Sequence, residues 1–109
     1  MNLSAKEKRI VREFKKRIDE TFPDELISLT LFGSRARGEA ASESDMDLLA
    51  VIRTEDWRLG DRIRELGYAL ELQHGLVLSI QVMSLQHMER IKKMRTQFFE
   101  AVEEEGIVM

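Results

Sequence analysis

Residues 33–49 open with Gly33-Ser34-Arg35-Ala36-Arg37-Gly38 and, after a short polar segment, end with Ser44-Asp45-Met46-Asp47-Leu48-Leu49. The segment follows Leu26–Phe32, a β-prone run that stops abruptly at Gly33, so the Gly-Ser pair is expected at a strand-to-helix turn. The first N–H groups of a helix lack intrahelical partners and attract anions. We therefore expect the turn to bind phosphate, with Gly33 permitting close approach and Ser34 capping the helix or donating to an oxygen.

The second half of the segment predicts a metal site. Asp45 and Asp47 alternate with apolar residues at the start of a run that continues to Ile52, which is the pattern of a strand buried on at least one face. Both carboxylates then point the same way, about 6.6 Å apart at the backbone, and can converge on one or two Mg²⁺ ions. The alternative is that both aspartates are solvated on an edge strand. It does not explain why two charges interrupt a buried apolar run, where an unpaired charge is costly.

These residues resemble a known signature. The pattern G-S-x-A-R-G … S-D-x-D of minimal nucleotidyltransferases in the DNA polymerase beta superfamily is matched by Gly33, Ser34, Ala36, Arg37, Gly38, Ser44, Asp45 and Asp47. The resemblance implies a reaction in which an acceptor hydroxyl attacks the α-phosphorus of a Mg²⁺-bound nucleoside triphosphate and pyrophosphate leaves. It also implies Mg²⁺ or Mn²⁺ as the cofactor and favours ATP as the substrate.

The resemblance further implies a role for each matched residue. Asp45 and Asp47 would hold the metal. The Gly33 N–H and the Ser34 hydroxyl would hold the β and γ phosphates at the helix start. Arg37 would stabilise the departing pyrophosphate or orient the aspartate pair.

The predicted third strand, Leu76–Met83, departs from the family pattern. Members of this superfamily commonly carry a third carboxylate here, facing the first two. The best-aligned position is Gln81, with Ser79 one pleat away on the same face, and neither side chain is charged. An amide oxygen can bind Mg²⁺ weakly but cannot serve as a general base at neutral pH. Glu43 or Glu71 could reach the site, although nothing in their spacing indicates it.

Composition limits the other classes of function. A chain of 109 residues, 43% of them hydrophobic, is expected to form one domain over residues 1–109. No apolar segment approaches the roughly 20 residues that span a bilayer, and the charged start lacks a signal-peptide core, so a cytoplasmic location is expected. The absence of cysteine excludes disulfides and thiolate catalysis, and His74 and His87 form no recognisable metal motif.

A partner protein is expected because one small domain leaves no room for an acceptor-binding domain. The net charge of −3 argues against nucleic acid as the partner. The basic residues of the first twenty positions are interleaved with carboxylates, which is typical of a solvated helix face. The resemblance implies an antitoxin paired with a helical HEPN-type ribonuclease in a toxin–antitoxin module. Self-association into a homo-oligomer is compatible with the sequence.

Three functional hypotheses follow. The first is an adenylyltransferase that modifies a hydroxyl of a partner protein. The second is a catalytically degenerate antitoxin or binding subunit that neutralises a partner by direct contact, which the uncharged Gln81 favours. The third is a catalytic subunit for a small-molecule or RNA acceptor held by a separate helical chain.

The periodicity of apolar residues predicts an open α/β fold, in which a small mixed sheet of three to four strands is backed by helices. The expected elements are a helix capped by Ser4 and ending before Pro23, a strand over 26–32, a short helix from Ser34, a strand over 45–53, a helix capped by Asp56 and ending at Gly75, a strand over 76–83, one long helix from Ser84 through Val102, and a short edge strand or subunit contact over 107–109. Trp57 is interpreted as a packing residue at a helix start.

Overall fold

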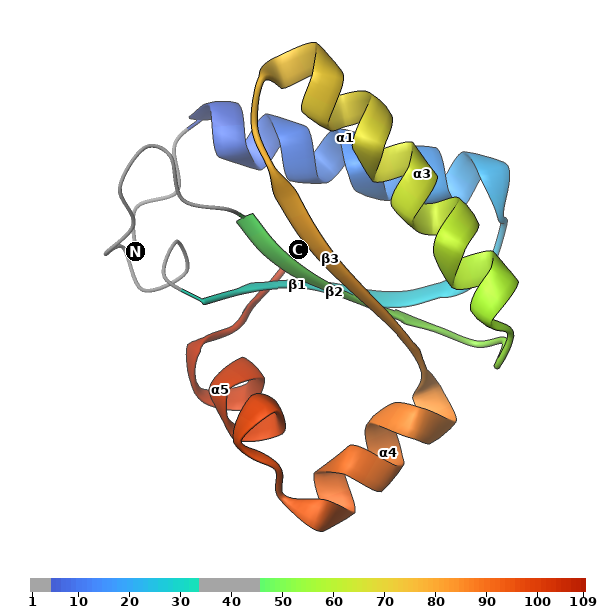
Figure 1. Cartoon of the computed structure of the whole chain (residues 1–109), viewed down its shortest axis with the longest axis vertical. Helices are drawn as coiled ribbons and strands as arrows, with labels where there is room; N and C mark the ends of the chain where they lie inside the picture. The colour runs from blue at the N-terminus through green and yellow to red at the C-terminus, as the bar shows by residue number, and fades with distance from the viewer. Residues whose placement is uncertain (1–4, 34–45) are drawn as a thin grey trace.

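A four-stranded mixed sheet with helices on both faces forms the centre of the computed structural model, which describes residues 5–33 and 46–109 (Figure 1). The elements are α1 (Ala5–Thr21), β1 (Leu26–Phe32), β2 (Met46–Ile52), α3 (Trp57–His74), β3 (Leu78–Ser84), α4 (Leu85–Met94), α5 (Gln97–Glu105) and β4 (Ile107–Val108). The predicted α/β fold with a small mixed sheet is confirmed. The predicted Ser4 cap and the helix expected from Ser34 lie outside the described residues.

The strands lie in the order β3-β2-β1-β4. β1 pairs antiparallel with both β2 and β4, whereas β2 and β3 are parallel. A parallel pair needs a long crossover, and α3 supplies it. The predicted edge strand at the end of the chain is confirmed, because Val108 pairs with Thr30 of β1.

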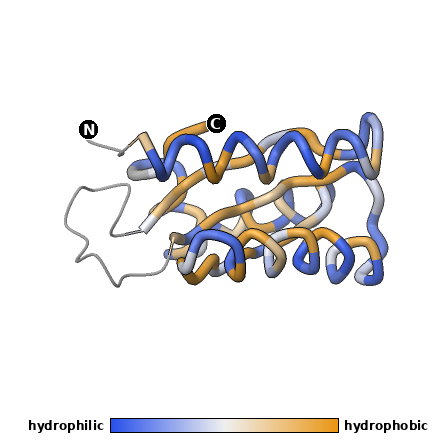
Figure 2. The backbone as a smooth tube through the Cα atoms, turned by 90° about the horizontal axis from the view of Figure 1, so that it is seen from above, coloured by the Kyte–Doolittle hydropathy of each residue, from blue (hydrophilic) through white to orange (hydrophobic). Residues whose placement is uncertain are grey.

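Alternation along β2 gives the sheet two apolar faces. One face packs against α1 and α3 and contains Met46, Leu48, Ala50 and Ile52. The opposite face carries Leu49 and Val51, which pack with Val102 of α5. The α1 helix shows the matching pattern, since Ile10, Phe14 and Ile18 are buried and its other faces are polar (Figure 2). Asp47 alternates with Leu48 and therefore lies on the second face of the sheet.

The predicted helix caps are confirmed where the structure describes them. The Asp56 side chain accepts a hydrogen bond from the Arg58 N–H, and Gly75 ends α3 in the left-handed conformation at φ 69°. Ser84 accepts from the His87 N–H and so begins α4 directly at the end of β3.

The prediction of one long C-terminal helix is wrong, because the helix is interrupted after Met94. Arg95 adopts a left-handed backbone at φ 48°, and Thr96 then caps a second helix by accepting from the Phe99 N–H. The apolar periodicity continues across this break, so periodicity alone did not reveal it. The new direction of α5 places Phe98 against Phe32 of β1, with ring centroids 5.4 Å apart.

The interpretation of Trp57 as a packing residue is also wrong, because its side chain is 74% exposed. The buried residues of α3 begin one turn later, at Gly60. The Arg58 guanidinium lies 5.8 Å from the Trp57 ring centroid.

A polar cluster joins α1 to α3 on the helical side of the sheet. Arg17 Nη2 donates to Glu13 Oε1 at 2.8 Å and to Gln73 Oε1 at 3.2 Å. His74 Nε2 lies 3.6 Å from Glu13 Oε2. The hydrogen bond from Arg17 is the main cause that lowers the pKa of Glu13 below its ordinary value of 4.5.

This lowered pKa predicts a pH-dependent contribution of Glu13 to stability. A carboxyl whose pKa is lower in the folded than in the unfolded state stabilises the fold above the unfolded pKa and loses that effect as the pH falls through the folded pKa. We expect Glu13→Gln to lower the free energy of unfolding near neutral pH and to match the wild type in acid. Urea unfolding across pH checks this, with Glu20→Gln as the control, since Glu20 forms an exposed 3.8 Å pair with Lys16. A deficit that persists unchanged in acid would contradict the prediction.

Candidate functional site

The backbone of Gly33 lies directly against the carboxylate of Asp47. Gly33 has a positive φ of 79°, a conformation that side chains other than glycine's rarely adopt. A Cβ atom added to Gly33 would overlap Oδ2 of Asp47 and would lie 3.1 Å from its Cγ. The glycine is therefore required twice, by the backbone conformation and by the carboxylate that occupies the space of a side chain.

Strand register explains this contact. Phe32, the last residue of β1, is paired with Asp47, the second residue of β2. The next residue, Gly33, begins the turn and lies beside the acidic side chain. Asp47 itself is half-buried on the face of the sheet that also carries Leu49 and Val51. The phosphate-binding turn and the metal-binding strand predicted from the sequence thus meet at one point.

Three of the predicted site residues, Ser34, Arg37 and Asp45, lie outside the described residues. Two of the described site residues, Gly33 and Asp47, are in direct contact. The third described position, Gln81, is exposed and pairs with Leu49 rather than with Asp47.

The β3 residue beside Asp47 is Ser79. Neighbouring strands are about 4.8 Å apart, so the Ser79 side chain is one strand away from Asp47 on the same face. The sequence identified the correct face of β3, because Ser79 and Gln81 share it, but register between strands has no signal in one sequence. Glu71 does not serve the site, because its Oε1 accepts from the Leu78 N–H at 2.7 Å.

The residues present fit a divalent cation bound through a small number of protein oxygens. Among the described residues no group of three His, Cys, Asp or Glu side chains could enclose a metal. Mg²⁺ does not need such a group, because it commonly binds one or two carboxylates and substrate phosphates. The Asp47 carboxylate lies against the Gly33 backbone, at the start of the predicted phosphate-binding turn. Asp47 is the described donor, and Asp45 is its predicted companion.

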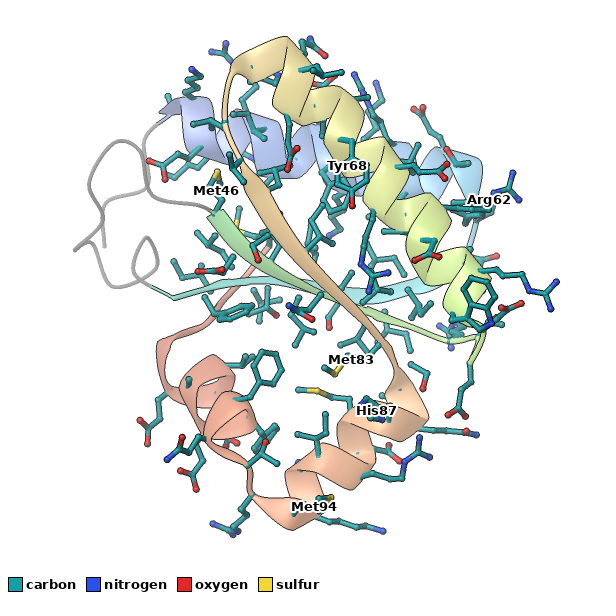
Figure 3. All side chains as sticks on the ribbon, viewed as in Figure 1. Met46, Arg62, Tyr68, Met83, His87 and Met94 are labelled. Carbon is teal, nitrogen blue, oxygen red and sulfur yellow. The ribbon has the colours of Figure 1, made fainter. Side chains whose placement is uncertain are left out.

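A separate hollow of about 380 Å³ lies at the opposite end of β2. It is bordered by Trp57, Arg64 and His87, and by none of the described site residues. Figure 3 shows the separation, with Met46 at the start of β2 and His87 at the start of α4. The contact between Gly33 and Asp47 therefore lies away from this hollow.

Comparison with known families identifies the domain. The model of the nucleotidyltransferase domain family matches residues 11–106. This match covers most of the chain, including every predicted site residue.

Three proteins of Methanocaldococcus jannaschii, each named "Putative protein adenylyltransferase", are similar in sequence. MJ1305 is 37% identical over 73 residues, which cover 64% of this chain and 50% of that protein. MJ0141 is 29% identical over 99 residues, or 90% of this chain and 93% of that protein. MJ0604 is 31% identical over 103 residues, or 94% of this chain and 97% of that protein. The chain thus spans half of the first relative and nearly all of the other two.

Solved structures with a similar fold include two toxin–antitoxin complexes. A toxin–antitoxin crystal structure with AMP-PNP gives a TM-score of 0.53 at 17% identity, covering 93% of this chain and 70% of that one. A mutant of the toxin–antitoxin MntA–HpeT gives a TM-score of 0.56 at 16% identity, covering 89% of this chain and 69% of that one. At such low identity these matches establish the fold.

No helix within residues 5–33 and 46–109 is both long and apolar enough to cross a membrane.

Proposed function

This chain belongs to the nucleotidyltransferase domain family, and from that membership we propose that it transfers AMP from ATP to a hydroxyl group of a partner protein. The observation that carries the proposal is the contact between the Gly33 backbone and the Asp47 carboxylate. It joins a turn suited to phosphate with a strand suited to a metal. The names of the three archaeal relatives support adenylyl transfer to protein in particular.

In the proposed reaction, Asp47 and Asp45 hold Mg²⁺, or Mn²⁺, together with the triphosphate of ATP. The bound metal supplies charge neutralisation on the phosphate oxygens. Asp47 is placed for this role because its carboxylate lies against the Gly33 backbone, in the space that a side chain at position 33 would fill. The register with Phe32 on one side and Ser79 on the other holds the carboxylate in this position.

The turn residues bind the phosphates that leave. The Gly33 N–H and the Ser34 hydroxyl are proposed to donate to the β and γ phosphates, and Arg37 to neutralise the departing pyrophosphate. In the transfer, a bond forms between the acceptor oxygen and the α-phosphorus, and the bond from that phosphorus to the pyrophosphate oxygen breaks. Arg37 is proposed to neutralise the negative charge that develops on the departing pyrophosphate.

The acceptor hydroxyl must lose its proton during this step. Neither Ser79 nor Gln81 can accept it at neutral pH, because a hydroxyl and an amide are not basic enough. We therefore propose that the aspartate pair or a water molecule accepts the proton. Rate enhancement in this site then depends mainly on positioning and on charge neutralisation.

We further propose that the acceptor is a helical HEPN-type toxin, and that transfer to it neutralises the toxin. The toxin–antitoxin complexes among the fold neighbours support this setting.

The proposal is tested by incubating the chain and Mg²⁺ with α-labelled ATP and a purified helical HEPN-type protein as the proposed partner. We expect label to appear on the partner and to be absent when γ-labelled ATP is used, because AMP carries only the α-phosphate. Partner protein without label from either nucleotide would contradict the proposal.

A second function is favoured by the uncharged face of β3. With Ser79 beside Asp47 and Gln81 beside Leu49, the described strands offer one carboxylate where active members commonly have more. The chain could then act as a binding subunit that neutralises its partner by contact alone. In that case the Asp47→Asn variant would neutralise the partner as well as the wild type does.

The register of β3 predicts that Ser79→Asp creates a better metal site. Two carboxylates one strand apart repel each other without a cation, so we expect this variant to melt at a lower temperature in EDTA. Mn²⁺ should restore the melting temperature and bind about tenfold more tightly than to the wild type, since an added carboxylate ligand contributes roughly 1.4 kcal/mol. Titration calorimetry and thermal melts in EDTA and Mn²⁺ measure both effects.

Gln81→Asp is the matched control for this prediction. It adds the same charge to the same face but beside Leu49. We expect it to leave Mn²⁺ affinity close to that of the wild type. Equal gains in the two variants would show that the register does not define the site.

A further inference from the structure

The α4 helix carries four apolar side chains, and the domain fully buries none of them. Leu85, Met88, Ile91 and Met94 recur at every third position, yet none of the ten residues of α4 is buried. Amphipathic helices in a folded domain normally bury their apolar residues. The α4 helix lies on the side of the sheet opposite α1 and α3 (Figure 1).

Several apolar side chains of α4 and α5 belong to neither core cluster. Met88 and Phe98 pack against the cluster of Leu49, Val51 and Val102, but the remaining four do not. These four are Leu85, Ile91, Met94 and Phe99. Leu85 is 41% exposed and Met94 is 72% exposed. Figure 3 places Met94 at the end of α4 that is remote from the sheet.

Charges of opposite sign flank these side chains. The end of α4 carries Lys92, Lys93 and Arg95, and α5 carries Glu100, Glu103 and Glu104; all six are exposed. Although the two groups are close in sequence, none of the six forms an ion pair with a residue that the structure describes. Cations and carboxylates from both helices border one hollow of about 140 Å³ together with Phe99.

We propose that this α4–α5 face binds the same face of a second copy of the chain about a two-fold axis. In such a dimer the cationic end of α4 meets the acidic α5 of the partner copy, and the reciprocal contact forms at the same time. Ile91, Met94 and Phe99 become the apolar centre, and the charges set the orientation.

We propose a second copy of the chain as the partner because its face carries charges complementary to those of the first copy. A two-fold interface must be self-complementary, and this face offers three cations and three carboxylates around a shared apolar patch, none of them in an ion pair within residues 5–33 and 46–109. A strand-addition dimer is less suited, because α3 already covers the free edge of β3. Glu71 accepts from the Leu78 N–H there, and the Arg64 Nε donates to the Ile80 carbonyl.

Paired charge reversals test the dimer. Lys92→Glu/Lys93→Glu makes the face mainly acidic and leaves Arg95 of the three cations, and Glu103→Lys/Glu104→Lys makes it mainly basic and leaves Glu100 of the three carboxylates. We expect sedimentation equilibrium of the full chain to show a salt-sensitive wild-type dimer and a dissociation constant at least about tenfold weaker in each variant. Mixing the two variants should restore the dimer, because each supplies the charge that the other has lost.

The control is Lys6→Glu/Lys8→Glu, which changes the net charge equally on α1 and should leave the dimer intact. Circular dichroism confirms that every variant is folded. A wild-type monomer at all concentrations up to about 1 mM would overturn the proposal. A dimer whose dissociation constant is unchanged by both charge reversals would also overturn the proposal. So would a failure of the mixed variants to form a dimer, or binding of this face to a different protein alone.

Discussion

Replacing Asp47 with asparagine is expected to lower nucleotidyl transfer by about 10³-fold while leaving the fold intact. Asparagine has nearly the same shape, so the pairing of Phe32 with residue 47 and the packing of Leu48 should survive. The substitution removes an anionic ligand of the proposed metal. Charge stabilisation by a bound metal contributes several kcal/mol to the transition state, and about 4 kcal/mol corresponds to a factor of about 10³.

The measurement is the initial rate of AMP transfer from α-labelled ATP to the partner. Asp61→Asn is the matched control, because Asp61 is exposed on α3 and pairs with Arg64 at 2.9 Å, away from the site. We expect this control to transfer AMP at the wild-type rate. A rate for Asp47→Asn within a few-fold of the wild type would contradict the role of Asp47 as a metal ligand.

Gly33→Ala is expected to have the second largest effect, with a loss of about 10²-fold in transfer. Its methyl group would occupy the position of the Asp47 carboxylate, which must then turn away from the turn and from the phosphates. A misplacement of about 1 Å at a reacting centre is enough for a loss of this size. The left-handed conformation adds a cost of about 1–2 kcal/mol to folding.

Gly75→Ala separates these two effects. Gly75 has a similar positive φ of 69°, but an added Cβ would meet no atom within 4 Å. Both variants should therefore lose in thermal melts the stability that the left-handed conformation costs, and only Gly33→Ala, which also displaces Asp47, should lose transfer. If both variants lost activity equally, backbone strain rather than contact with Asp47 would be the cause.

The sequence predicted those parts of the structure that depend on local chemistry. Alternation around Asp47 and Leu48 predicted the strand and its faces, and the caps at Asp56, Gly75 and Ser84 predicted where helices begin and end. These signals reside in a few neighbouring residues. They are therefore present in any single chain.

Features that depend on distant parts of the chain were predicted less well. The pairing of Asp47 with Ser79 depends on the register between β2 and β3. The alternation of residues along β3 places Ser79 and Gln81 on the same face, so it does not distinguish them. The break at Arg95 preserves apolar spacing and became visible only with the packing of α5. The contact of Gly33 with Asp47 needed both strands in place, although the sequence had indicated each partner separately.

The most direct test of the Gly33–Asp47 site is a calorimetric titration of ATP into the protein with and without Mg²⁺. The wild type and Asp61→Asn should bind ATP only when the metal is present, and Asp47→Asn should lose this binding. Absence of ATP binding to the wild type at about millimolar nucleotide would contradict the account. Metal-dependent binding that remains unchanged in Asp47→Asn would contradict it equally.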